Sequence, residues 1–173
     1  MTRAVVPRPA RARPVPPAHS RRSVAPGILL GLGLGGFFDG IVLHQILQWH
    51  HMLSCSYPPI TLVNLQLNTL ADGLFHAAAY VFVAAGVFLL WRQARKPGFT
   101  LSGRVFTGSL LIGFGIFNLV EGVINHHLLG IHHVNETVLP HQWLWWDLGF
   151  LAWGAAMLIG GLYMLRPRQR RES

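Results

Sequence analysis

The chain has 173 residues, of which 51% are hydrophobic and only 12% are charged, about half the charged share of a soluble domain. Its formal net charge is +8, but lysine and arginine lie only before the first apolar segment, between the second and third, and after the last. This distribution is typical of a four-span membrane protein with both termini in the cytoplasm, and it argues against nucleic-acid binding. Cys55 is the single cysteine, which excludes an intramolecular disulfide.

Residues 1–25 are rich in arginine, proline and alanine and lack apolar periodicity, so we expect a disordered basic cytoplasmic tail. A transmembrane domain is predicted over residues 26–165, and residues 166–173 form a second basic cytoplasmic tail. Four apolar segments, each near the ~20 residues that cross a bilayer, are expected at about 26–48, 69–91, 105–127 and 143–165. The predicted fold class is therefore all-α, a four-helix transmembrane bundle with N-in/C-in topology.

A polar pattern in the first span recurs in the third span at an offset of 82 residues. It consists of a carboxylate followed by glycine, a histidine five residues after the carboxylate, and a His-His pair. Its two copies are Asp39-Gly40, His44 and His50-His51, then Glu121-Gly122, His126 and His132-His133. The second and fourth spans share a weaker match at an offset of 75, Asp72-Gly73-Leu74-Phe75 and Asp147-Leu148-Gly149-Phe150. The sequence thus predicts two tandem two-helix repeats, related by a pseudo-twofold axis along the membrane normal.

Each span carries one carboxylate, and the first three also carry a histidine, although buried ionisable groups oppose membrane insertion. In the predicted topology all these groups lie in the outer half of the membrane, so we expect them to converge in the bundle interior. Asp39 and His44 are five residues apart, about 140° around an ideal helix. Either the two side chains serve different parts of a site or the helix is distorted, and the glycine after each carboxylate favours a π-bulge or kink.

Neutral imidazoles and carboxylates are ligands of zinc, iron and copper, so we expect a transition-metal site in the outer leaflet. The histidines expected to bind the metal directly are His44, His76 and His126. Three carboxylates would complete the coordination sphere or orient the imidazoles, namely Asp39, Asp72 and Glu121, and either of the last two would be the catalytic base. The loop pairs would form a second site, an entry funnel or extra ligands: His50, His51, His132 and His133. Four further residues are expected to support the ligands: Asp147, Asn118, Asn125 and Gln48, the last on the helical face of His44 and His51.

The motifs from Gly36 to His44, from Gln48 to His51 and from Asn118 to His127 resemble a family of predicted bacterial integral membrane proteins. That family is catalogued as a domain of unknown function. The resemblance covers roughly residues 26–165 and implies a protein of the bacterial inner membrane, without implying an activity.

We expect an integral membrane metalloprotein, either a metal-dependent oxidoreductase or hydrolase acting on a lipid-soluble or periplasmic molecule, or a redox protein. The alternatives are a transporter or metallochaperone for metal ions or protons, and a b-type haem protein with two span histidines as axial ligands. The inner halves of the spans hold almost no ionisable groups, which argues against a conduit within one chain. The sequence leaves open whether the protein is an enzyme and whether it forms a homo-oligomer.

Overall fold

The computed structural model describes residues 24–167, so most of the two predicted basic tails lies outside the described residues. Within that range every regular element is helical, and four helical spans are long and apolar enough to cross a membrane. The spans are Val24–Ile46, Leu62–Ala94, Gly103–Leu128 and Pro140–Leu165. The first and third each consist of an α-helix that continues as a π-helix: α1 (Val24–Phe37) with η2 (Phe38–Ile46), and α3 (Gly103–Glu121) with η3 (Gly122–Leu128). The other two are α2 (Leu62–Ala94) and α4 (Pro140–Leu165), and together the four confirm the predicted all-α, four-span fold.

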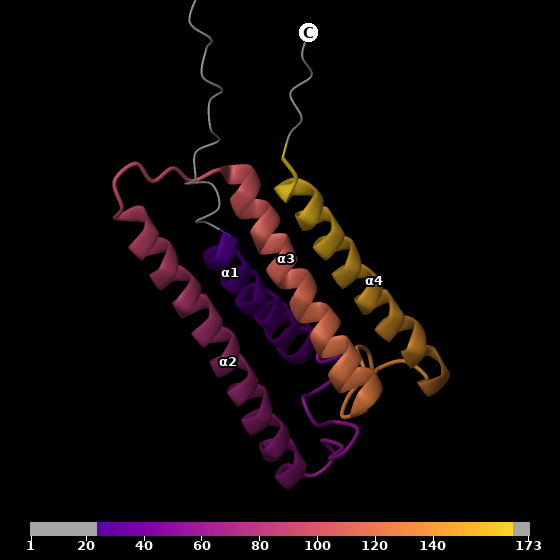
Figure 1. Ribbon diagram of the computed structural model, residues 1–173. Coiled ribbons are helices and arrows are strands. Elements are labelled where there is room, and N and C mark those ends of the chain that lie inside the picture. The colour runs from indigo at the N-terminus through magenta and orange to yellow at the C-terminus, as the bar shows by residue number, and fades with distance from the viewer. Residues whose placement is uncertain (1–23, 168–173) are drawn as a thin grey trace, which may run out of the picture.

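The four spans form a row in which α1 and α3 pack against each other in the centre, α2 packs on α1, and α4 packs on α3 (Figure 1). Within the described residues, α2 and α4 do not contact each other. The helices α1 and α3 run in one direction, and α2 and α4 run in the other (Figure 1). Both π-helices and both long loops, residues 47–61 and 129–139, therefore lie at the same end of the molecule, which we call the site end.

Glycine allows α1 and α3 to approach closely at the centre of the row. An ideal Cβ atom built on Gly31 would lie 2.9 Å from Gly113 Cα, and one built on Gly113 would lie 2.9 Å from Gly31 Cα. In membranes, such small-residue contacts replace the hydrophobic effect as a source of helix association, because they bring the two backbones into van der Waals contact. The crossing at these two glycines fixes the distance between η2 and η3 at the site end.

Capping residues explain where two of the helices begin. The side chain of Thr61 accepts a hydrogen bond from Asn64 N at 3.2 Å, so α2 begins at Leu62, seven residues before the expected start of its span. The helix α4 begins with Pro140, whose missing N–H costs nothing in the first turn.

The π-helices confirm the distortion that the spacing of Asp39 and His44 predicts. Leu47 N donates to Val42 O at 2.8 Å, and Leu129 N donates to Ile124 O at 2.8 Å, both with the i→i+5 pattern of a π-helix. The wider turn brings residues five apart onto nearly the same face. It also ends the first span at Ile46, so Gln48 lies beyond the helix, exposed and with a φ of 49°, rather than on the face of His44.

Candidate metal centre

The first half of the site joins η2, α2 and the loop between them. In η2, His44 Nε2 lies 3.2 Å from Asp39 Oδ2, and both side chains are buried. On the other side of the ring, His44 Nδ1 donates to Asp72 Oδ1 at 3.0 Å. The second oxygen of Asp72 accepts a hydrogen bond from His51 Nδ1 at 2.7 Å, and Met52 N donates to Oδ1 at 2.8 Å. Asp72 thus orients His44 and fixes the start of the loop.

The same contacts recur in the second half. In η3, His126 Nε2 lies 3.1 Å from Glu121 Oε2, and His126 Nδ1 faces Asp147 Oδ1 at 3.6 Å. Asp147 accepts a hydrogen bond from His133 Nδ1 at 2.6 Å and another from Val134 N at 3.0 Å. Asp147 of α4 therefore lies beside the histidine of η3 as Asp72 of α2 lies beside the histidine of η2.

One histidine of each loop donates a hydrogen bond to the backbone of the other loop, and these two contacts complete the site. His50 Nδ1 donates to Val134 O of the other loop at 2.9 Å, and His132 Nδ1 donates to Met52 O at 3.0 Å. The rings of His50 and His132 stack in parallel, with centroids 4.6 Å apart and an interplanar angle of 3°. Burial, followed by the neighbouring imidazoles of His132 and His44, lowers the pKa of His50 well below its ordinary value of 6.5. His50 is therefore neutral at physiological pH, with a lone pair on Nε2.

Three imidazoles and two carboxylates meet in the interior with buried atoms that make no hydrogen bond. These atoms are Nε2 of His44, His50 and His126, Nδ1 of His126, Oε2 of Glu121, and both carboxylate oxygens of Asp39. Two of the Nε2 atoms face carboxylate oxygens of this set, at 3.2 Å between His44 and Asp39 and at 3.1 Å between His126 and Glu121. A buried polar atom without a partner costs about 1–3 kcal/mol, and native structures contain few of them. So many in one place indicate a ligand that binds to them.

The facing nitrogen and oxygen atoms also need a proton or a metal ion between them. His132 has an acceptor on each side, because Nδ1 faces Met52 O and Nε2 lies 2.8 Å from Glu121 Oε1. His44 and His126 likewise have a carboxylate on each side. A neutral imidazole carries a single N–H, so a proton or a metal ion must lie between each Nε2 atom and the carboxylate that it faces.

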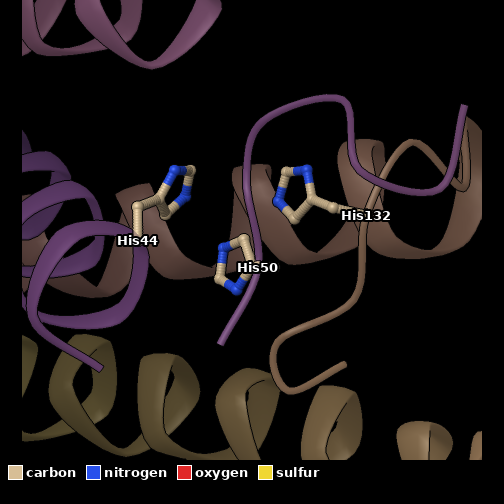
Figure 2. A group of neighbouring side chains, drawn as sticks. All are labelled: His44, His50 and His132. Carbon is tan, nitrogen blue, oxygen red and sulfur yellow. The ribbon is translucent and has the colours of Figure 1, made fainter. Parts of the chain in front are cut away.

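Two groups of three side chains have ligand atoms close enough to hold a metal ion. They are His44, His50 and His132, and Glu121, His126 and His132, with the ligand atoms of each group within 4.8 Å of one another. Figure 2 shows the rings of the first group gathered at one place, although they come from η2 and from both loops. Nδ1 of His44, His50 and His132 is held by a carboxylate or a backbone carbonyl, which is how proteins orient histidine ligands so that Nε2 faces a metal ion.

The structure does not bring all the expected residues to this centre. His76 lies against Gly40, with its Nε2 buried and without a hydrogen-bond partner, and it belongs to neither three-residue group. Asn125 reaches the centre, because its Nδ2 donates to Glu121 Oε1 at 3.4 Å. The side chain of Asn118 is buried next to Gly154 of α4 and has no hydrogen-bond partner.

Two features of the site end were not predicted. Gln45, rather than Gln48, donates to Asp72 Oδ2, at 3.3 Å. Glu136 Oε1 ties the two loops together, since it accepts hydrogen bonds from Ser54 Oγ at 2.9 Å and from His133 N at 3.0 Å. Cys55 Sγ also donates to this oxygen, at 3.3 Å, and burial together with the charge of Glu136 raises the pKa of the thiol to about 12. Glu136 is the only acidic residue of the described part outside the spans. This isolated position is the sequence feature that could have indicated a role for Glu136 in the loops.

The loops therefore divide the paired histidines into two roles. His50 and His132 point into the centre, and His51 and His133 hold Asp72 and Asp147 from the outside, with 20% and 23% of their side chains exposed. Of the three roles considered for the pairs, this geometry favours extra ligands for the first residue of each pair.

Comparison with known proteins places the chain in a family. A family model described as predicted membrane protein (DUF2243) matches residues 26–168, which include every residue of the centre and all of the four spans except Val24 and Ala25. No curated protein and no solved structure is detectably similar to the chain. The chain belongs to the DUF2243 family of predicted membrane proteins.

Proposed function

We propose that this membrane protein binds a transition metal through His44, His50, His126, His132 and Glu121, with Asp39 facing His44 from the interior. One observation carries the proposal: three histidines, His44, His50 and His132, are held through Nδ1. In addition, the Nε2 atoms of His44, His126 and His132 face two buried carboxylates. The donors are nitrogen and oxygen, without a thiolate, and this set suits zinc, iron or copper. Asp72 and Asp147 support the ligands and do not reach the metal.

The same arrangement favours a metal-dependent oxidoreductase or hydrolase. A metal ion held by either three-residue group would keep coordination positions free for a substrate, as catalytic sites do. A metal ion bound there would supply Lewis acidity and, if it is iron or copper, electron transfer. If His44, His50 and His132 hold the metal ion, Glu121 is free to act as a base, with Oε2 buried and 3.1 Å from His126 Nε2.

The alternative functions fit the geometry less well. A haem with span histidines as axial ligands needs room for its macrocycle, but the space beside His44 is occupied by the rings of His50 and His132, with centroids 4.2 and 5.8 Å away. A transporter needs polar groups along its path, but all ionisable residues buried in the described part lie at the site end. The helix crossing further in is made of glycine and apolar side chains.

The distribution of charge supports a position in the bacterial inner membrane with the site end facing the periplasm. The lysine and arginine residues of the described part all lie at the opposite end: Arg92, Arg95, Lys96, Arg104 and Arg166. Cytoplasmic loops of membrane proteins are enriched in these residues, so both termini would be cytoplasmic.

Elemental analysis of detergent-purified protein tests the proposal. We expect about one or more transition-metal ions per chain in the wild type, and loss of most of that metal in the double variant His50→Ala/His132→Ala. His76→Ala and His141→Ala are the matched controls, because neither residue belongs to a three-residue group, and both should retain the metal. A wild-type protein that takes up no metal from zinc, iron or copper solutions, or equal metal content in all variants, would contradict the proposal.

A further inference from the structure

Two apolar pockets flank the metal centre at corresponding positions. The η2 pocket, of about 350 Å³, lies between η2 and α4, and its lining includes Phe38, Val42, Leu43 and Phe150. The η3 pocket, of about 270 Å³, lies between α3–η3 and α2, and its lining includes Val120, Ile124, Asn125 and Phe75. The first three residues of each set are related by the offset of 82, and the phenylalanines by the offset of 75.

The two pockets differ in their access to the centre. Glu121 lines the η3 pocket, whereas its counterpart Asp39 is not part of the η2 pocket. Trp49 and Trp153 line the η2 pocket at positions where the other half has isoleucine and alanine. The η2 pocket therefore ends on aromatic rings, and the η3 pocket ends on a carboxylate of the centre.

The η3 pocket opens toward lipid. Its lining residues Phe82, Val120 and Ile124 are 42%, 52% and 41% exposed, and all three belong to segments that span the membrane. The groove lies between α2 and α3, and α1 behind them contributes Leu32 (Figure 1). A molecule dissolved in the bilayer can enter it sideways, without crossing the loops at the site end.

We propose that the η3 pocket binds a neutral, bilayer-dissolved alcohol, whose hydrocarbon body packs on Phe75, Phe82 and Phe117 and whose hydroxyl group meets Glu121. The lining is apolar except for Glu121 and Asn125, so the ligand needs one polar end and an otherwise hydrophobic body. Glu121 accepts hydrogen bonds, which selects a hydroxyl donor over an ether or a hydrocarbon. The volume, at the low end for ligand sites, fits a medium-chain or single-ring alcohol rather than a whole phospholipid.

This inference rests on the proposed function only where it makes the alcohol a substrate of the metal centre. Binding itself uses Glu121 and the phenylalanine walls, which are present with or without a metal ion. The two proposals can therefore fail separately.

Photolabelling with a diazirine-bearing octanol tests the pocket. The full-length protein, reconstituted in phosphatidylcholine nanodiscs with and without zinc, is irradiated, and the labelled residues are identified by mass spectrometry. We expect saturable labelling of residues in α2, α3 and η3 that line the pocket, and competition by excess 1-octanol but not by octane. Ile124→Trp fills the pocket and should reduce the labelling about tenfold or more. A tenfold loss of affinity corresponds to about 1.4 kcal/mol of binding free energy. Val42→Trp, the corresponding change in the η2 pocket, should leave it unchanged.

Three results would overturn the inference: labelling that does not saturate, equal competition by octane and octanol, or unchanged labelling in an Ile124→Trp protein that melts like the wild type. If Ile124→Trp fails to fold, competition by octanol and by octane on the wild-type protein still tests whether the pocket binds an alcohol. Saturable labelling of a protein that takes up no metal would support the pocket and reject the metalloprotein, and metal uptake without saturable labelling would do the reverse.

Discussion

Gly31→Ala should disturb the metal centre from a distance, because Gly31 sets the separation of α1 and α3. The added methyl group would collide with Leu110 O of α3 and lie 2.9 Å from Gly113 Cα, whereas carbon atoms in favourable contact lie about 3.5–4.0 Å apart. The two helices must therefore move apart by about 1 Å. Such overpacking typically costs about 1–3 kcal/mol in free energy of unfolding. Since η2 continues α1 and η3 continues α3, the movement separates the ligands of one half from those of the other.

Two measurements check this prediction. The thermal midpoint of the detergent-purified protein should fall by about 2–12 °C, from about 2–4 °C per kcal/mol for a chain of this size. Metal affinity, measured by competition with a chromophoric chelator, should fall by about 10–100-fold, the loss typical when the support of a ligand is removed. The matched control is Gly160→Ala in α4, where an added Cβ would meet no atom within 4 Å. If the two variants had the same midpoint and affinity, the glycine crossing would not control the centre.

Three further predictions concern single contacts. Asp72→Ala should weaken metal binding by about 10–100-fold in the chelator assay. Asp72→Asn should stay closer to wild type, because the asparagine oxygen can still accept the hydrogen bond that orients His44. Equal losses of metal affinity in the two variants would refute this positioning role. Gly40→Ala should lower the free energy of unfolding by about 1–3 kcal/mol, since its methyl group would collide with His76 Nε2, and the added change His76→Ala should restore most of it. At pH 8, Cys55 should react with iodoacetamide about 100-fold more slowly in the folded than in the denatured protein, because its pKa of about 12 leaves little thiolate. Glu136→Gln should accelerate that alkylation in the folded state, and an unchanged rate would show that the carboxylate does not suppress the thiol.

Hydropathy and spacing were sufficient to predict the spans and part of the site. Apolar composition identifies all four helices, because a membrane span must satisfy its backbone internally and cover it with hydrocarbon. The π-helices were also accessible, since a carboxylate and a histidine five residues apart meet only if the helix is wider than usual. Both elements depend on local sequence, and the structure confirms both.

The position of His76 could not be predicted from the same information. Its spacing from Asp72 places both residues on one face of α2, but the packing of α2 against η2 decides what that face meets. Gly40 leaves a space that His76 fills, and this contact joins residues far apart in sequence.

The roles within the His-His pairs likewise depend on contacts between the loops. His50 turns inward because Val134 O accepts its Nδ1–H, and His132 does so because Met52 O accepts its Nδ1–H. Backbone carbonyls carry no sequence signal, so no local pattern distinguishes the inward histidine of each pair from the outward one. The hydrogen bond from Ser54 Oγ to Glu136 was not predictable either, because it joins two loops that lie far apart in the sequence.

X-ray absorption spectroscopy at the edge of the bound metal tests the metal centre most directly. Coordination by the four histidines and Glu121 predicts a first shell of nitrogen and oxygen at about 2.0–2.2 Å, with the outer-shell scattering of at least two imidazoles and no sulfur at about 2.3 Å. The imidazole scattering should decrease in His50→Ala/His132→Ala and remain in His76→Ala. A sulfur shell, a porphyrin-like spectrum, or a spectrum that the double substitution does not change would contradict binding at this cluster.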